Sequence, residues 1–336
     1  MKLIPRLLLS LPVIFGIATG AAVAQTKEVT IAHQDMIVPF RVQQAAGAVE
    51  KATGYKISWK MFGGGGDVIK AMASGQVPIG EVGSSPITAA AAQGIDIQLI
   101  WILDDINNAE QLVASNKSGA TTLAGLKGKK VATPFVSTAH YQLLFALNKA
   151  GVNPKEIQIL NLRPPEIAAA WERGDLDATF IWEPVLSKVK ADGKVVISAA
   201  DVAKQGAPTF DGIIVNRAWA AANKDFLVAY VKAMAAADAD YKANAAKYGK
   251  GSEHATAIAK IVGAKPDDVS GVLADYAFPS AAEQASDKWL GGGAKGGAAQ
   301  ALANTAVFLK EQNRITEIPA DFGKFVNPEF AAAAAK

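Results

Sequence analysis

The sequence predicts an α/β fold built from two successive segments of alternating strands and helices. Short β-branched runs alternate with amphipathic or alanine-rich stretches between residues 29 and 215, which is typical of parallel or mixed sheets covered on both faces. The alternation restarts with different residues at Leu112. The length of 336 residues, with 50% hydrophobic and 19% charged residues, fits one large or two medium globular domains.

The first segment joins its strands to its helices through glycine and serine residues. Four glycines, Gly63 to Gly66, precede a helix whose first turn carries Asp67. Pro86 stands at the first position of an alanine-rich helix, where its missing N–H removes no helical hydrogen bond. The expected elements are strands at 29–32, 56–61, 79–82 and 97–103, and helices at about 41–51, at 67–73 and from 86 onward.

The second segment repeats this pattern and is followed by a mostly helical remainder. From about Asp225 the chain is rich in alanine with spaced Val, Leu, Ile and Tyr, and residues 331–335 are expected to form a frayed tail. The second segment closes near residues 212–215. Its expected elements are strands at 112–114, 157–160 and 178–181, a turn leading into a strand across 126–132, and helices at 137–150 and 165–173.

Residues 1–24 are predicted to be a cleaved secretory signal peptide. Lys2 and Arg6 precede an apolar run at 7–18, and small residues at 22–24 suit a signal peptidase. The apolar run is interrupted by proline and glycine and is shorter than a membrane-spanning helix requires. Since the chain contains no Cys, no lipid can be attached at the cleavage site. We therefore expect a free periplasmic protein.

Composition excludes several classes of function. The absence of Cys removes disulfide scaffolds, thiolate metal sites and cysteine nucleophiles, and three scattered His argue against a metal centre. No cofactor is expected. The net charge of +3 falls to +1 without the leader, because 32 basic residues then face 31 acidic ones, and no basic run indicates nucleic-acid binding.

Serine and threonine at two strand-to-helix junctions are candidate anion ligands. Ser84 and Ser85 begin one helix, and Ser137 and Thr138 begin another. Exposed N–H groups and the helix dipole favour anions at such positions, although plain helix capping is the alternative. No G-x-S-x-G or H-E-x-x-H motif and no nucleotide-binding glycine pattern occurs, so catalysis is not expected.

Several motifs in a fixed order resemble the periplasmic receptors of nitrate, sulfonate and taurine ABC importers. Three of them are GSSP at 83–86, PFVSTAHY at 134–141 and AAWERGDLDA at 169–178. Further segments at 161–166, 206–211 and 306–312 are most similar to the taurine receptors of that family. The similarity extends from about residue 29 to residue 325.

This resemblance implies a two-lobe fold of the type II periplasmic binding proteins, with two mixed sheets flanked by helices and two hinge crossovers. The first lobe is expected at 25–110 plus 214–336, and the second at 111–213. The crossovers are placed near Glu110 and Asp211. A monomer is implied, with a membrane permease and its ATPase as partners that recognise the closed form.

The implied ligand is taurine, a zwitterion whose sulfonate and ammonium both need partners. Ser84, Ser85, Ser137 and Thr138 are expected to serve the sulfonate, with an amide donor from Gln34. Asp211 and Glu110 are expected to serve the ammonium, and Trp182 to add a cation–π face. His140 is expected to line the cleft. The alternatives are a turn residue for Asp211, hinge packing for Trp182 and helix packing for His140.

Other functions stay open on sequence alone. Gly63 to Gly66 lack polar side chains, and Gly212 and Ile213 lack an aromatic after the crossover aspartate. A receptor for another short alkanesulfonate or small anion is therefore the first alternative. The others are a biosynthetic enzyme on the same fold and a sensory domain that presents its ligand to a membrane protein.

Overall fold

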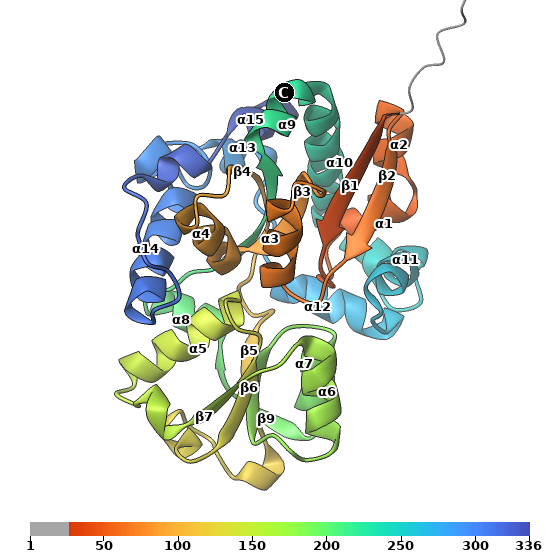
Figure 1. The fold of residues 1–336 in the computed structure, drawn as a ribbon. Coiled ribbons are helices and arrows are strands. Elements are labelled where there is room, and N and C mark those ends of the chain that lie inside the picture. Colours follow the sequence, from red (N-terminus) through yellow and green to blue (C-terminus); the bar gives the residue numbers. More distant parts are fainter. Residues whose placement is uncertain (1–26) are drawn as a thin grey trace, which may run out of the picture.

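The computed structural model describes residues 27–336, which form two α/β lobes, one above the other in Figure 1. The expected signal peptide at 1–24 lies outside the described residues. Within the described part of the chain, no helix combines the length and the apolar character needed to cross a bilayer. The two-sheet α/β architecture expected from the sequence is confirmed.

The first lobe is built on a five-stranded sheet with the order β2-β1-β3-β10-β4. β2, β1 and β3 are parallel, whereas β10 runs antiparallel between β3 and β4. β4 is an almost fully buried apolar strand, as suits the edge of a sheet that helices cover. The strands are β1 (Glu28–His33), β2 (Lys56–Met61), β3 (Ile79–Gly83), β4 (Ile97–Asp105) and β10 (Phe210–Asn216).

The second lobe has a five-stranded sheet of the same kind, with the order β7-β6-β8-β5-β9. Here β7, β6 and β8 are parallel and β5 runs antiparallel to both of its neighbours. The strands are β5 (Gln111–Ser115), β6 (Lys130–Thr133), β7 (Gln158–Asn161), β8 (Ala178–Ile181) and β9 (Gly193–Ser198).

Helices cover both sheets, and most of them surround the first lobe (Figure 1). Those that precede the first crossover are α1 (Phe40–Ala45), α2 (Ala48–Thr53), α3 (Gly65–Ala73) and α4 (Ser84–Ala92). Those of the second lobe are α5 (Thr138–Lys149), α6 (Pro164–Glu172), α7 (Val185–Lys190) and α8 (Ala199–Lys204). The remainder forms α9 (Arg217–Ala222), α10 (Lys224–Ala243), α11 (Glu253–Val262), α12 (Val269–Asp275), α13 (Ala281–Ala285), α14 (Gly297–Glu311) and α15 (Glu329–Ala334).

Two stretches connect the lobes, residues 106–110 between β4 and β5 and residues 205–209 between α8 and β10. The division expected between residues 213 and 214 therefore falls inside β10. Phe210 begins that strand, and Asp211 pairs with Gly83 on one side and Asp104 on the other. All of β10 thus belongs to the first sheet, and the second crossover lies a few residues earlier than expected.

Two local expectations are corrected. The helix expected at 41–51 is two helices, because Gly47 adopts a left-handed conformation with φ of 61° between α1 and α2. The expected tail at 331–335 is largely α15, which packs on α10 and α13 and buries Phe330. An aromatic side chain adjacent to the alanines gives this segment an apolar contact that a frayed tail would lack.

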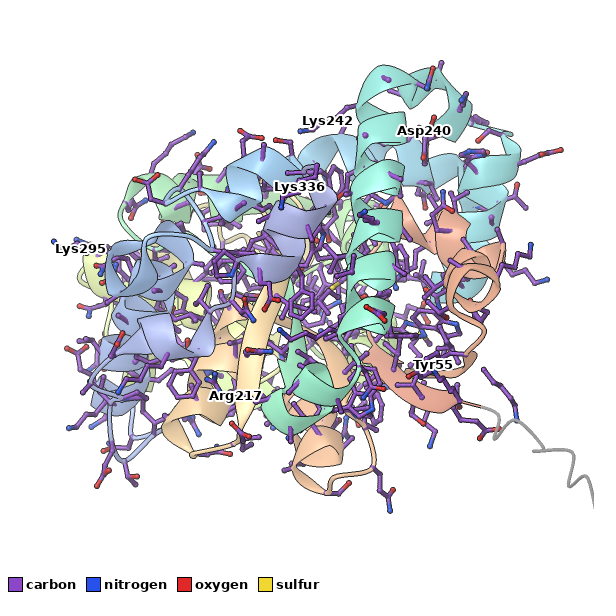
Figure 2. The ribbon with its side chains drawn as sticks, turned by 90° about the horizontal axis from the view of Figure 1, so that it is seen from above. Tyr55, Arg217, Asp240, Lys242, Lys295 and Lys336 are labelled. Atoms are coloured by element: carbon purple, nitrogen blue, oxygen red, sulfur yellow. The ribbon has the colours of Figure 1, made fainter. Side chains whose placement is uncertain are left out.

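Seen from above, charged side chains lie at the rim of the first lobe. Figure 2 labels Arg217, Asp240, Lys242 and Lys295 of this lobe, with α10 running through the right half of the view. The candidate binding site lies between the two lobes.

Candidate functional site

A small chamber lies where the two lobes meet. Gln34 follows β1, Gly83 ends β3, Thr138 follows β6 and Trp182 follows β8, so the chamber forms at the carboxyl ends of parallel strands, where open α/β sheets bind ligands. Its cavity volume is about 20 Å³, which holds about one water molecule, so the lobes are closed on it. Its walls are formed by Gln34, Met36, Gly65, Gly83, Pro86, Glu110, Ser137, Thr138, Trp182, Asp211 and Tyr276.

Glu110, at the first crossover, is a buried carboxyl in the chamber wall. Its Oε1 accepts a 2.6 Å hydrogen bond from Thr138 Oγ1, whereas its Oε2 is buried without a partner. Burial raises the pKa of Glu110 to about 8, and the Thr138 hydroxyl opposes that rise only in part. Once Glu110 is ionised, its free Oε2 is an acceptor that suits a cationic ligand group.

Asp211, on β10, is the second buried carboxyl of the wall. A Cβ at Gly83 would lie 3.2 Å from Asp211 Oδ1, so the glycine leaves room for this carboxyl. Directly opposite on β4 stands Asp104, which is fully buried. Burial, followed by the charges of Glu110 and Glu81, raises the pKa of Asp211 well above its usual value.

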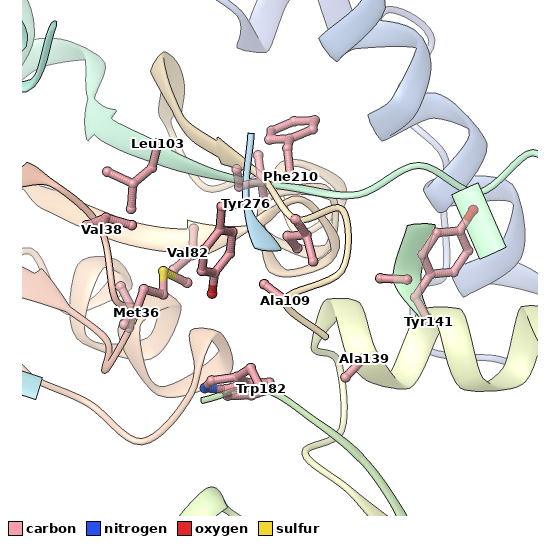
Figure 3. Close-up of a cluster of buried hydrophobic side chains, with 14 of the residues drawn as sticks. Met36, Val38, Val82, Leu103, Ala109, Ala139, Tyr141, Trp182, Phe210 and Tyr276 are labelled. Carbon is pink, nitrogen blue, oxygen red and sulfur yellow. The ribbon is translucent and has the colours of Figure 1, made fainter. Parts of the chain in front are cut away.

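Asp35 and Trp182 join the lobes across the chamber. Trp182 Nε1 donates a 2.9 Å hydrogen bond to Asp35 Oδ1. Burial raises the pKa of Asp35 to about 6, and the indole N–H works against that rise. Figure 3 shows Trp182 below Tyr276, whose hydroxyl points into the gap between the two rings.

An ion pair beneath the chamber shapes the loop that carries Gln34. Arg41 is fully buried and forms a salt bridge with Glu81, while it also donates to the carbonyl oxygens of Gln34 and Met36. Gln34 in turn donates from Nε2 to the Glu81 carbonyl oxygen over 3.2 Å. These partners neutralise and hydrogen-bond the Arg41 guanidinium. Its charge therefore holds the loop and Glu81 in place and is not directed at the chamber.

The structure brings together six of the nine residues expected from the sequence, and it places three elsewhere. Ser84 is fully buried, with Oγ 3.5 Å from the Phe210 N–H, and Ser85 Oγ is buried without a partner. His140 accepts a 3.3 Å hydrogen bond from the Val136 N–H and stacks on Phe135. Burial, with a smaller effect of Arg314, lowers the pKa of His140 to about 4, so this ring is neutral at neutral pH.

A wider cavity of about 440 Å³ forms the outer mouth of the cleft. It shares Gly65, Pro86 and Ser137 with the chamber, so the two spaces adjoin. Across this mouth, Arg163 of the second lobe forms a salt bridge of 2.9 Å with Asp67 of the first. The four glycines that the sequence places before α3 line the same mouth.

Three residues near the ligand space were not expected. Asp35, Asp104 and Tyr276 become part of the site, or of its support, only through folding. Asp104 is the last residue but one of an apolar strand, and Tyr276 comes from the helical remainder. Among the described residues no group of His, Cys, Asp and Glu is arranged to hold a metal ion. The arrangement instead suits an organic cation next to hydrogen-bond donors.

Several known proteins are similar to this chain. Residues 51–246 match the family model described as NMT1/THI5 like. The taurine-binding periplasmic protein of Escherichia coli is 34% identical over 307 residues, covering 91% of this chain and 93% of that protein. The periplasmic aliphatic sulphonate binding protein SsuA of E. coli superposes with a TM-score of 0.71 at 22% identity, over 90% of this chain and 92% of that one. The desulfurization enzyme DSZB shares the fold, with a TM-score of 0.62 at 12% identity, over 92% of this chain and 99% of that one.

Proposed function

Because this chain belongs to the NMT1/THI5-like family, as a solute-binding protein of an ABC importer rather than an enzyme, we propose that it captures taurine in the chamber between its lobes. The proposal rests on two buried carboxyls, Glu110 at the first crossover and Asp211 on β10 just after the second. Neither has a cationic partner in the described protein. The ligand would supply that cation.

The ammonium end of taurine fits the carboxyl side of the chamber. A buried cation needs a compensating charge and acceptors for each N–H. Asp211 provides a carboxylate, Glu110 Oε2 an unused acceptor, and Trp182 an aromatic face. A ligand that lacks the amine would leave these acceptors unsatisfied, so the site should discriminate strongly against it.

The sulfonate end fits the part of the wall where two helices begin. α5 starts at Thr138 with Ser137 as its N-cap, and α3 starts at Gly65 after Gly64, whose lack of a side chain leaves the first turn without a side-chain cap. The N–H groups and dipoles of helix starts favour a permanently ionised anion. Gln34 is the amide in the wall, although its Nε2 is already bonded to Glu81.

Capture requires that the lobes separate and close again. With the lobes as they stand, the chamber of about 20 Å³ holds about one water molecule, so taurine can be admitted and held only with the lobes further apart. Motion at residues 106–110 and 205–209 would open it, and closure would bring Asp35 to Trp182 and Asp67 to Arg163. We further propose that an exported, unanchored monomer closes its lobes on taurine and delivers it in that ligand-bound form to a membrane permease.

Calorimetric titration tests the ligand. The wild-type protein should bind taurine and should bind ethanesulfonate, which lacks the amine, at least about 100-fold more weakly. Asp211→Asn should weaken taurine far more than ethanesulfonate, whereas Asp287→Asn, at an exposed position, should change neither. Equal affinity of the wild type for both ligands would assign the site to simple alkanesulfonates, and no heat with either would refute sulfonate binding.

A further inference from the structure

Asp104 and Asp211 form a carboxyl pair of which only one member reaches the chamber. The two residues are directly opposed where β4 and β10 pair. Asp211 lies in the chamber wall, whereas Asp104 is fully buried behind it. Neither oxygen of Asp104 has a hydrogen-bond partner in the described structure.

Among the described residues, the charged groups that act on this pair are acids. Glu81 on β3 and the neighbouring Asp105 on β4 add negative charge, and Glu110 at the crossover adds more when it is ionised. Tyr276 faces the same carboxyls with a neutral hydroxyl. The guanidinium of Arg41 is held in its salt bridge with Glu81. Two ionised carboxylates in contact, without water or a cation, would therefore be strongly disfavoured.

We propose that Asp104 keeps a proton in both the free and the ligand-bound protein and donates it to one oxygen of Asp211, so that the other oxygen faces the chamber. Asp104 is then a positioning residue for the carboxylate that receives the cation. This inference rests on the proposed function, because it assumes a ligand with an ammonium group. The pair carries one negative charge in total, which matches one ammonium.

This arrangement predicts different taurine affinities for two substitutions of Asp104. Asp104→Asn keeps a donor toward Asp211 and keeps the charge of the pair, so taurine affinity should stay within about threefold of wild type. Asp104→Leu removes the donor at similar volume, and the loss of a hydrogen bond to a charged acceptor should weaken taurine by about 10-fold to 100-fold. Ethanesulfonate affinity should change by less than about threefold in both variants.

The experiment combines titration calorimetry with infrared spectroscopy of the same proteins. The difference spectrum between wild type and Asp104→Asn should contain the C=O stretch of a protonated carboxyl at pH 7, with and without taurine. A fall of tenfold or more in taurine affinity for Asp104→Asn would show that Asp104 acts as an ionised ligand group, which overturns the proposal. Wild-type taurine affinity in Asp104→Leu would also overturn it.

This design distinguishes a failure of the inference about Asp104 from a failure of the proposed function. Should Asp104→Leu fail to unfold cooperatively on heating, the infrared band and the Asp104→Asn titration decide the matter between them. Should the wild type bind no amine-bearing sulfonate, the proposed function fails. The carboxyl band still shows in that case whether Asp104 holds the proton, and its absence would overturn the inference independently.

Discussion

Replacing Glu110 with Gln should stabilise the ligand-free protein in a pH-dependent way. The folded protein raises the pKa of Glu110 from 4.5 to about 8. The unfolded state releases this proton first, so stability falls as pH rises above 4.5 and stops falling above about 8. At roughly 1.4 kcal/mol per pKa unit, the full effect on the free energy of unfolding is on the order of 5 kcal/mol. Glutamine cannot ionise, and its side-chain oxygen still accepts from Thr138.

The assay is urea unfolding of wild type and Glu110→Gln at a series of pH values between 4.5 and 9. The difference between the two free energies of unfolding should grow through that range and level off near pH 8 to 9. Since only the difference is read, the other titrating groups cancel. Glu172→Gln, at an exposed position on α6, should give a curve parallel to wild type. A parallel curve for Glu110→Gln would refute the idea that this carboxyl is desolvated without a cation.

Three further substitutions test two contacts across the closed cleft and the backbone at Val136. Gly83→Ala would place a Cβ 2.7 Å from Thr138 Cγ2 on the other lobe, so small-angle scattering should show a more open protein with unchanged thermal stability, and a compact one would contradict this. Trp182→Phe removes the N–H that donates to Asp35. Taurine should then bind about tenfold more weakly at pH 8, and the loss of affinity should be smaller at pH 5, where Asp35 is protonated. Equal losses of affinity at the two pH values would argue against a role for this hydrogen bond. Val136→Gly relieves a β-branched residue at φ of 67°, so urea unfolding should show a gain of about 1 kcal/mol, and a loss above that size would show that its packing dominates.

The sequence predicts best those features of the site that depend on residues close together in the chain. The junctions at Gly83 and Ser137 and the carboxyls at Glu110 and Asp211 were expected, because short motifs mark them and the family resemblance gives their context. His140 was expected in the cleft because it stands close to Thr138 in sequence. In a helix, two positions apart means about 200° of rotation, which turns His140 away from the side that Thr138 presents to the chamber.

Contacts between distant segments escaped prediction for a different reason. Asp104 resembles the polar end of an apolar strand, and only the insertion of β10 beside β4 brings Asp211 against it. Tyr276 reaches the site from a part of the chain that carries no binding motif. Such partners are set by strand order, which local residue patterns do not specify.

The position of β10 has a consequence for how the chain is made. This strand lies between β3 and β4, but it follows them by about a hundred residues, all of the second lobe included. The hydrogen bonds that complete the first sheet must wait until residue 216 has left the ribosome, whereas the second lobe consists of one uninterrupted stretch. Such late, long-range pairing slows folding. We propose that this chain is exported. The delay then gives the chain time to cross the membrane before the sheet of the first lobe is complete.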